Sequence, residues 1–337
     1  MKAISYTETG APSVLQLVDR EPGTPGPGEV RVRVVVSGVN PTDWKTRSGN
    51  GQPLGFDEVV PNQDGAGTVD ALGEGVTGLE VGQRVWLYLA QHQRPTGTAQ
   101  ELTVLPAERV VPLGDGASFD VGASLGVPAM TAHRALTVAE DGPSRLHPGA
   151  LDGRVVLVAG GAGAVGHAAI QLARWAGATV VTTVSGPEKA ALATAAGAHH
   201  VVNYREGDAA AEIRAVAPDG VHLVVEVAPG QNAALNAAVT ANRASIAIYA
   251  NNGGDEMTLD VRPHMVLNTR FQFVLLYTVG AEALANAVED VQAAVAAGVL
   301  EVGESTGLPL HRFPLGRTAD AHAAVQAGVT GKVLVDV

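Results

Sequence analysis

A glycine-rich segment at residues 161–166 offers the clearest chemistry in this 337-residue sequence. It reads Gly161-Ala162-Gly163-Ala164-Val165-Gly166, a GxGxxG pattern that follows the apolar run 155–159 and opens a stretch of helical periodicity. At such a junction the first glycine allows a tight turn, the second lets the backbone approach a pyrophosphate, and the third packs helix on strand. Free N–H groups at the helix start attract the anion. We therefore predict a dinucleotide-binding site, with a purely structural glycine turn as the alternative.

The end of the following strand predicts which dinucleotide binds. Enzymes that bind NAD place Asp or Glu there, about 20 residues after the glycines, to accept a hydrogen bond from the ribose 2′-hydroxyl. Here the segment 182–186 reads Thr-Thr-Val-Ser-Gly and has no acid that would repel a 2′-phosphate. Lys189 lies just beyond, and Tyr204 and Arg205 follow the third strand. We predict NADPH as the cofactor; the alternative is that Lys189 and Arg205 are ordinary solvated charges.

Metal and thiol chemistry lack the residues that they need. The sequence has no cysteine, which excludes disulfides, thiolate ligands and a cysteine nucleophile. Its ten histidines are scattered, and the adjacent His199 and His200 stand at a strand start, where neighbouring side chains point to opposite faces. We expect no metal site.

Two kinds of periodicity divide the chain. Residues 1–126 carry short β-branched runs between Gly and Pro turns, which indicates a small barrel. From residue 127 onward apolar strands alternate with helices, which predicts βαβ units and an α/β fold with a doubly wound parallel sheet. The predicted strands are 155–159, 179–184, 200–203, 221–227, 245–249 and 271–276, and the helices after the glycine-rich turn include 188–196, 208–216, 231–240 and 282–297.

The composition is that of an acidic globular protein. Hydrophobic residues make up 46% and charged residues 17% of the chain, which argues against disorder. A formal net charge of -12 repels phosphate backbones, so we expect no nucleic-acid partner. No apolar run reaches the roughly 18 residues of a membrane helix, and the first residues lack a signal-peptide pattern. We expect a cytoplasmic protein without a membrane partner.

Further motifs extend through most of the chain. They include Val39-Asn40-Pro41-Thr42-Asp43-Trp44-Lys45, Asp64-Gly65-Ala66-Gly67, Val81-Gly82-Gln83-Arg84-Val85, Gly97-Thr98-Ala99-Gln100-Glu101, Leu125-Gly126-Val127-Pro128-Ala129-Met130-Thr131-Ala132 and Gly331-Lys332-Val333. On these motifs and the glycine-rich turn, the chain resembles the quinone oxidoreductase or zeta-crystallin family, a zinc-free branch of the medium-chain dehydrogenase/reductase superfamily.

The resemblance implies a two-domain fold and a set of site residues. The domains would be a GroES-like β-barrel catalytic domain over 1–126 and 279–337 and a Rossmann NADPH-binding domain over 127–278. Family members commonly pair through the edge of the Rossmann sheet, so we expect a homodimer. The matching positions are Asn40, Lys45 and Thr131 at the nicotinamide, Gly161, Gly163, Ala164, Val165 and Gly166 at the pyrophosphate, Ser185, Lys189 and Tyr204 at the 2′-phosphate, and Asn251, Val274 and Leu275 at the nicotinamide ribose and carboxamide.

The resemblance also narrows the chemistry. Zinc alcohol dehydrogenases of the superfamily bind catalytic zinc through Cys, His and an acidic residue; here Asn40 stands at the cysteine position and Gln63 at the histidine position. Without a Lewis acid, hydride adds most easily to a quinone or to the β-carbon of an enone, and the charge collects on an oxygen that can be hydrogen-bonded. Lys45 or Thr131 would donate to that oxygen or hold the cofactor.

Lys45 is a departure from the family pattern. Many quinone oxidoreductases carry Tyr at this position, and the Asp-Trp-Lys version is similar to relatives that include trans-acting enoyl reductases of polyketide synthesis. We therefore predict an NADPH-dependent reductase of a small quinone, enone or enoyl substrate, with Lys45, Thr131 and Asn40 as catalytic candidates. The alternatives are a dedicated enoyl reductase of a biosynthetic pathway and a non-catalytic, crystallin-like NADPH-binding protein. The expected substrate pocket draws on Trp44 and the segments 50–56, 86–93 and 275–279.

Overall fold

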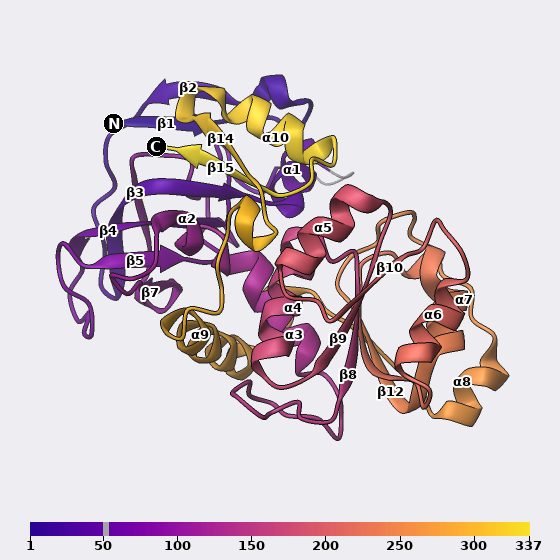
Figure 1. The fold of residues 1–337 in the computed structure, drawn as a ribbon. Helices are drawn as coiled ribbons and strands as arrows, with labels where there is room; N and C mark the ends of the chain where they lie inside the picture. Colours follow the sequence, from indigo (N-terminus) through magenta and orange to yellow (C-terminus); the bar gives the residue numbers. More distant parts are fainter. Residues whose placement is uncertain (50–53) are drawn as a thin grey trace. The chain divides into compact units, whose positions relative to one another are not determined.

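The computed structural model describes residues 1–49 and 54–337. These residues form two compact units (Figure 1): unit 1 comprises Met1–Val127 with Pro309–Val337, and unit 2 comprises Pro128–Leu308. Within the described residues, no helix is both long and apolar enough to cross a lipid bilayer.

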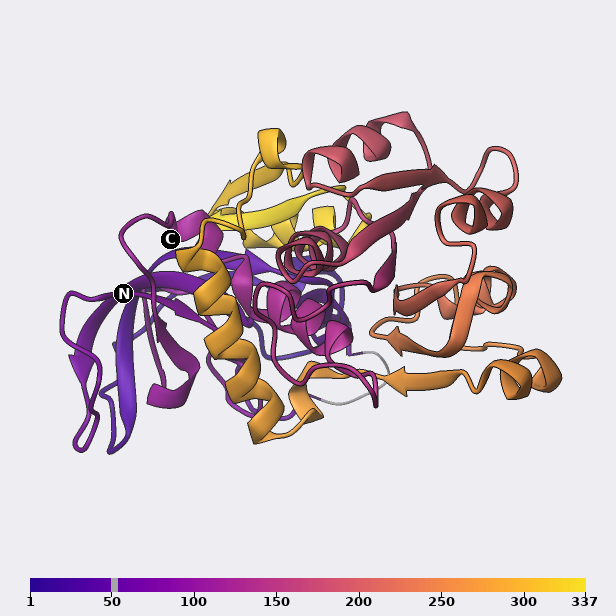
Figure 2. The ribbon, with the colours of Figure 1, turned by 60° about the horizontal axis from the view of Figure 1, so that its bottom comes forward.

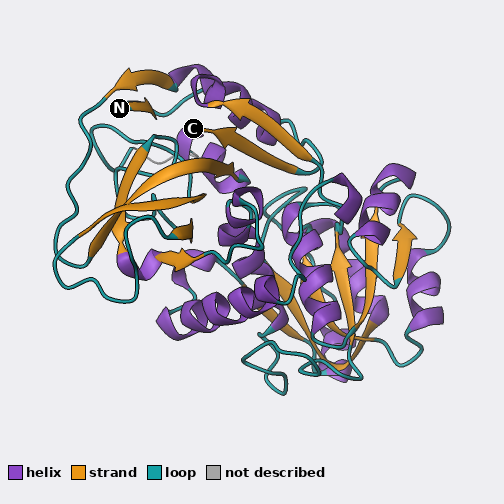
Figure 3. Cartoon of the chain, turned by 60° about the vertical axis from the view of Figure 1, so that its left-hand side comes forward, coloured by secondary structure: helices purple, strands orange, loops and turns teal. Residues whose placement is uncertain are grey.

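Unit 2 is built on a six-stranded parallel sheet (Figure 3). Its order is β10-β9-β8-β11-β12-β13, so the chain starts at the centre and winds outward in both directions. The predicted doubly wound α/β domain is therefore confirmed. The strands are β8 (Val155–Ala159), β9 (Thr179–Val184), β10 (His200–Asn203), β11 (Val221–Glu226), β12 (Thr240–Ile248) and β13 (Arg270–Phe273).

Helices cover both faces of this sheet (Figure 1). Helices α3 and α4 pack together on one face, and α6 and α7 pack together on the other. Under α6 and α7, Ile213 and Val239 pack with the strand residues Leu157, Val224 and Ile246. The helices of unit 2 are α3 (Met130–Leu136), α4 (Ala164–Trp175), α5 (Pro187–Ala195), α6 (Ala209–Val216), α7 (Pro229–Val239), α8 (Val261–Leu267) and α9 (Ala281–Ala296).

The predicted elements of unit 2 agree closely with these bounds, with three differences. Strand β12 begins at Thr240 instead of 245, because Thr240 already pairs with Val221 of β11. An irregularity that includes Arg243, at a φ of 65°, separates this pair from the regular pairing that starts at Ser245. Strand β13 ends at Phe273, and the predicted remainder turns into a short 3-10 helix, Leu276–Thr278. Helix α8 was not predicted, since its residues show no buried face in the structure.

Helix α9 belongs to unit 2, whereas the sequence placed the return to the first domain at residue 279. It packs on α3 (Figure 2) through Asp290. One carboxylate oxygen of Asp290 accepts from His133 Nε2 at 2.7 Å and from the Leu146 N–H at 2.6 Å, and the other accepts from Arg145 Nε at 2.8 Å. Because His133 lies on α3, this buried anchor keeps the chain in unit 2 until Leu308.

Unit 1 is organised around the long strand β3. It pairs in antiparallel fashion with β4, β6 and β15, whereas β14 and β15 pair in parallel. A separate pair, β1 and β2, packs its buried residue Ile4 with Val333 and Val335 of β15. The strands are β1 (Lys2–Ser5), β2 (Gln16–Asp19), β3 (Glu29–Val39), β4 (Asp64–Leu72), β5 (Arg84–Leu87), β6 (Leu102–Pro106), β7 (Val110–Pro112), β14 (Leu310–Pro314) and β15 (Lys332–Asp336), and the helices are α1 (Pro41–Ser48), α2 (Phe119–Gly122) and α10 (Thr318–Gln326).

The segment that carries Lys45 is helical. Helix α1 has Asn40 as its N-cap and Pro41 at the first position, where a missing N–H leaves no bond unmade. The Asp43 carboxylate accepts from the Asn40 N–H at 2.7 Å and closes a capping box. The helix ends at Gly49, whose φ of 85° is the left-handed conformation that glycine adopts without strain.

Replacing Asp290 by asparagine should loosen α9 from α3. The change removes the buried anion that His133 and Arg145 share, so we expect the free energy of unfolding at pH 7 to fall by about 2–4 kcal/mol. Burial raises the pKa of Asp290, but hydrogen bonds from His133 and Arg145 lower it more, and the net pKa lies below the usual value. The stabilisation is therefore present above the unfolded-state pKa and is lost as the pH falls through the folded-state pKa.

Urea unfolding of wild type and Asp290→Asn at pH 7, and again at about pH 3, measures both effects. The difference between the two proteins should shrink at the lower pH. Glu289→Gln is the control, because Glu289 bonds the same Arg145 but is 63% exposed, and an exposed pair contributes at most about 1 kcal/mol. Equal urea midpoints for wild type and Asp290→Asn at pH 7 would contradict the assignment.

Candidate functional site

The glycine-rich turn joins β8 to α4, as predicted, and its three glycines face different obstacles. A Cβ on Gly161 would lie 2.2 Å from Thr182 Oγ1, and one on Gly166 would lie 2.4 Å from the Gly160 carbonyl oxygen. A Cβ on Gly163 would meet only that same oxygen, at 3.5 Å. The fold therefore requires the first and third glycines, whereas the exposed second glycine leaves its backbone open to a ligand.

The start of α4 completes this turn. Gly163 is the N-cap of the helix, and the half-buried Ala164 and Val165 form its first positions. Their N–H groups have no partner from a preceding turn of the same helix, which is the arrangement that favours an anion. The predicted pyrophosphate residues are thus contiguous at one helix N-terminus.

The predicted 2′-phosphate residues lie at the carboxyl ends of β9 and β10. These strands are parallel neighbours, and the Tyr204 N–H donates to the Val184 carbonyl at 3.1 Å, which places Tyr204 close to Ser185. Tyr204 is 51% exposed, and Lys189 is exposed on the first turn of α5. A hydroxyl, an aromatic ring and a cation are therefore open to solvent where β9 ends without a carboxylate.

A cavity of about 620 Å³ opens at the carboxyl ends of β12 and β13. Its lining includes Asn251, Val274 and Leu275, the three residues predicted to contact the nicotinamide half of the cofactor. The Val274 N–H donates to the Ile248 carbonyl at 2.7 Å, and the Asn251 side chain donates to Asp255. Open α/β sheets bind ligands at this edge, so the structure brings these three residues together where a dinucleotide would lie.

Glu226 at the end of β11 is a candidate that sequence reasoning missed. Its buried carboxylate accepts from the Ala228 N–H at 2.6 Å, from Asn232 Nδ2 at 2.9 Å and from Asn236 Nδ2 at 2.7 Å. These bonds fix the start of α7, where Pro229 lines the 620 Å³ cavity. Two asparagines four residues apart, after a strand that ends in Glu, were the signal that could have identified it.

In unit 1, Asn40 is buried and bonded on both sides of its amide. Its Nδ2 donates to Asp64 Oδ2 at 2.7 Å, and its Oδ1 accepts from Lys332 Nζ at 2.7 Å. Asp64 and Lys332 were not predicted as site residues, although Asp64 begins the motif Asp64-Gly65-Ala66-Gly67 and Lys332 follows Gly331. Asn40 is 2% exposed, so this network positions the start of α1 in addition to any role toward the cofactor.

The charged groups of this network shift one another's pKa values. Burial, reinforced by repulsion from Asp64, raises the pKa of Asp43 to about 8. Burial also raises the pKa of Asp64 and lowers the pKa of Lys332. One buried ammonium, that of Lys332, thus lies near the two buried carboxyl groups of Asp43 and Asp64. The protonation states of these three groups therefore depend on one another.

Lys45 lies on the other side of α1 from this network. It is half-buried and lines a cavity of about 360 Å³ in unit 1, together with Phe56 and Gln91. Trp44 places its ring 6.0 Å from the Lys45 ammonium. Of the segment 50–56 predicted to form the pocket, residues 50–53 lie outside the described residues, and Leu54 to Phe56 line this cavity.

Thr131 belongs to unit 2, where it lies on α3 and is 6% exposed. No group of three or more His, Asp or Glu side chains that could hold a metal ion occurs within residues 1–49 and 54–337.

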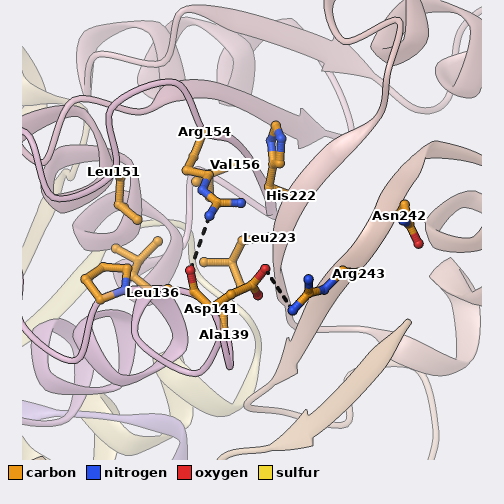
Figure 4. Close-up of a pocket in the computed structure, with 12 residues that line it drawn as sticks. Leu136, Ala139, Asp141, Leu151, Arg154, Val156, His222, Leu223, Asn242 and Arg243 are labelled. Carbon is orange, nitrogen blue, oxygen red and sulfur yellow. Dashed lines mark hydrogen bonds and ion pairs between the residues drawn. The ribbon is translucent and has the colours of Figure 1, made fainter. Parts of the chain in front are cut away.

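A third cavity lies at the amino ends of β8, β11 and β12, away from the glycine-rich turn (Figure 4). Arg154 and Arg243 both bond Asp141 across it, at 3.2 Å and 3.5 Å. Its volume is about 30 Å³, which is space for about one water molecule. It therefore serves the packing of the loop before β8 and not a substrate.

Two family models match the chain. Residues 26–115 match the model described as "Alcohol dehydrogenase GroES-like domain", and residues 164–299 match "Zinc-binding dehydrogenase". The quinone oxidoreductase of Lama guanicoe is 30% identical over 341 residues, which are 99% of this chain and 97% of the relative.

Solved structures show the same likeness over the full chain. A quinone oxidoreductase of Pseudomonas syringae pv. Tomato DC3000 superposes with a TM-score of 0.83 at 28% identity, covering 100% of this chain and 99% of that one. A mycobacterial relative solved in complex with NADPH superposes with a TM-score of 0.82 at 29% identity, covering 100% of both chains.

The three glycines of the turn should respond differently to alanine. Gly163→Ala adds a Cβ into open space at a φ of -85°, so the free energy of unfolding should change by less than about 1 kcal/mol, while dinucleotide affinity falls at least tenfold. Gly166→Ala places the Cβ 2.4 Å from a backbone oxygen and should lower stability by about 1–3 kcal/mol.

Thermal unfolding without ligand and titration with NADPH, followed by its fluorescence, separate the two effects. Gly114→Ala is the matched control, because a Cβ there meets nothing within 4 Å and the site lies in unit 1. An undiminished NADPH affinity in Gly163→Ala would show that the turn does not hold the pyrophosphate.

Proposed function

Because this chain belongs to the quinone oxidoreductase branch of the medium-chain dehydrogenase/reductase superfamily, whose members are NAD(P)H-dependent oxidoreductases, we propose that it reduces quinones or α,β-unsaturated carbonyl compounds with NADPH. The observation that carries the proposal is the phosphate-binding turn followed by a strand end that lacks an acid. The first would hold the dinucleotide, and the second would select its phosphorylated form.

The choice of NADPH rests on the residues beside Ser185. A carboxylate at the end of β9 would bond a ribose 2′-hydroxyl and repel a 2′-phosphate. Instead Ser185 and Tyr204 lie close together, and Lys189 is exposed on the first turn of α5. Ser185 and Lys189 would donate charge-assisted hydrogen bonds to the phosphate, and the Tyr204 ring would stack on the adenine.

The chain's side chains would then orient the reactants and neutralise charge. When bound, the reduced nicotinamide supplies a hydride to the quinone or to the β-carbon of the enone. Lys45 would donate to the substrate oxygen, where negative charge develops, and Thr131 would hold the carboxamide. Asn40 would support Lys45 indirectly, because its bonds to Asp64 and Lys332 fix the start of α1.

The donor set does not fit a catalytic zinc. Asn40 and Gln63 stand where zinc relatives carry Cys and His, and both amides are bonded internally, Asn40 to Asp64 and Lys332 and Gln63 to Gln91. Amide groups of this kind are poor zinc ligands beside thiolate and imidazole. We therefore propose a zinc-independent reaction.

A dedicated enoyl reductase of a biosynthetic pathway is the second candidate. It is favoured by Lys45, since a cation can stabilise an enolate oxygen as the double bond is reduced. A non-catalytic, crystallin-like role is a third, and NADPH oxidation in the presence of 9,10-phenanthrenequinone would exclude it.

We also propose that the protein forms a homodimer through the outer edge of β13. This strand pairs only with β12 among the described residues, so its other edge is open. The adjoining surface is apolar: Val261, Met265, Val266 and Phe273 are between 66% and 70% exposed. An open edge flanked by exposed apolar side chains is typical of a surface that another strand covers.

The cofactor proposal predicts that NADPH binds at least tenfold more tightly than NADH. Lys189→Ala removes one charge-assisted contact and should weaken NADPH binding by about 1.5–3 kcal/mol. The affinity for NADH, which has no 2′-phosphate, is the internal control and should change little. Equal affinities of the wild type for the two cofactors, measured by calorimetry, would contradict the proposal.

The dimer proposal predicts that a charge on α8 separates the subunits. Met265→Glu places a carboxylate on a side chain that is 70% exposed in the single chain, and burying it in an interface would leave it unpaired. Light scattering should report a dimer for wild type and a monomer for this variant. Val81→Glu is the control, because Val81 is similarly exposed, at 66%, but lies in unit 1; this variant should remain dimeric. A wild type that is monomeric at micromolar concentration would contradict the proposal.

A further inference from the structure

The cavity that Lys45 lines, called here the Lys45 cavity, has a basic side chain and no acidic one in its described lining, although the protein as a whole is acidic. The chain carries 34 acidic against 22 basic residues, yet no acidic side chain lines this cavity among the described residues. Lys45 is the cation in the described lining. In an acidic protein, such a cavity favours an anionic ligand over a neutral one or a cation.

Two nearby carboxylates are held by other partners, and a third, Asp57, is exposed beside the cavity residue Phe56. Glu58, beside the cavity residue Val59, bonds Arg20 at 2.7 Å. Asp43, on the same helix as Lys45, is buried and accepts from the N–H groups of Asn40 and Gln63. None of these three carboxylates belongs to the described cavity wall, whose side chains are Lys45 and uncharged residues.

The two cations at the end of α1 have different roles. Arg47 is fully buried and donates to the Gly10 carbonyl at 2.6 Å and to Gln326 Oε1 at 2.7 Å, which ties α1 to α10. Lys45 instead is half-buried at the cavity. Arg47 thus packs α1 against α10, whereas Lys45 contributes to the cavity wall.

Neutral donors surround the ammonium. The hydroxyls of Thr9, Thr42 and Thr46 belong to residues of the lining. Gln91 Oε1 accepts from Gln63 Nε2 at 3.0 Å, and Gln91 Nε2 donates to the Arg94 carbonyl at 3.1 Å. The second N–H of that nitrogen is therefore the donor that this amide can offer a ligand. Hydroxyl and amide N–H groups around one ammonium are the donors that a carboxylate accepts from.

The rest of the wall is apolar. Leu54, Phe56 and Val59 line it, and Phe56 is 39% exposed. A ligand that fills about 360 Å³ there needs a hydrocarbon or aromatic part as well as an anionic group.

We propose that the Lys45 cavity selects substrates that carry a carboxylate, so that the preferred substrate class is a conjugated carbonyl compound with an anionic carboxylate and an apolar body. This inference rests on the proposed function and narrows its substrate. In the reaction the cofactor hydride goes to one alkene carbon and a proton from water goes to the other. The double bond is reduced, NADPH is oxidised to NADP⁺, and the carboxylate is unchanged. A neutral quinone has a carbonyl oxygen that can accept from Lys45 but no carboxylate, so it lacks the anionic partner that the cavity favours.

The test uses a matched pair, trans-3-benzoylacrylate and its methyl ester, with NADPH. We expect wild type to show kcat/KM at least tenfold higher for the acid, although the ester is the more electrophilic alkene. In Lys45→Gln the acid-to-ester ratio should fall at least tenfold, and in Lys45→Arg, which keeps the charge, it should stay within threefold of wild type. Lys2→Gln removes an exposed lysine that pairs with Asp19 and should leave the ratio unchanged.

Binding of the saturated products, 3-benzoylpropionate and its methyl ester, gives a readout without turnover. Calorimetry should show tighter binding of the acid to wild type and loss of that preference in Lys45→Gln. A wild type without acid preference, or a preference that survives Lys45→Gln, would overturn the inference while leaving the reductase proposal intact. If neither alkene is reduced but the product pair still shows a Lys45-dependent preference, the proposed reaction fails and the carboxylate site stands.

Discussion

The carboxylate of Asp64 is the contact on which the candidate site of unit 1 depends. It accepts from Asn40 Nδ2 at 2.7 Å and from the Val127 N–H at 2.9 Å, and it lies 3.7 Å from Lys332 Nζ. These partners come from the start of α1, the last residue of the first segment of unit 1, and β15 near the end of the chain. Gly126 is required for this approach, because a Cβ there would lie 2.1 Å from Asp64 Oδ1. One buried anion thus joins three segments that are far apart in the sequence.

The orientation of α1 follows from this arrangement. Asn40 is fixed by Asp64 and Lys332, and Asp43 then closes the helix start and accepts from the Gln63 N–H at 3.1 Å. The side chain of Gln63 holds Gln91 at the wall of the Lys45 cavity. A chain of hydrogen bonds therefore connects the buried charges to the Lys45 cavity. The position of the cavity wall thus depends on Asp64 and Lys332, which do not line the cavity.

Much of unit 2 could be predicted because its determinants are local. The periodicity of apolar residues predicts the order of strands and helices. The GxGxxG motif alone indicates that Gly161 and Gly166 have no room for a side chain. The return of the chain at residue 309 could not be predicted, because it depends on Asp290 meeting His133, which lies 157 positions away. Glu226 carried a partial signal in the spacing of Asn232 and Asn236, but its hydrogen bonds to them depend on how β11 and α7 are placed together. Lys45 was identified by its position in a motif, but its helix, its cavity and the absence of acids around it are tertiary properties.

The network at Asn40 and Gln63 also limits where chemical activation can come from. In zinc relatives these two positions carry the metal ligands, and a Lewis acid would stabilise the developing charge on oxygen. Here both amides already share their donors and acceptors with Asp64, Lys332 and Gln91, so rearranging them for a ligand would leave buried charges unbonded, which is costly. The electrophilic assistance that zinc would give must then come from a donor outside the network. We propose Lys45 for this role because it lines a cavity of unit 1, whereas Arg47 and Lys332 are buried inside the fold.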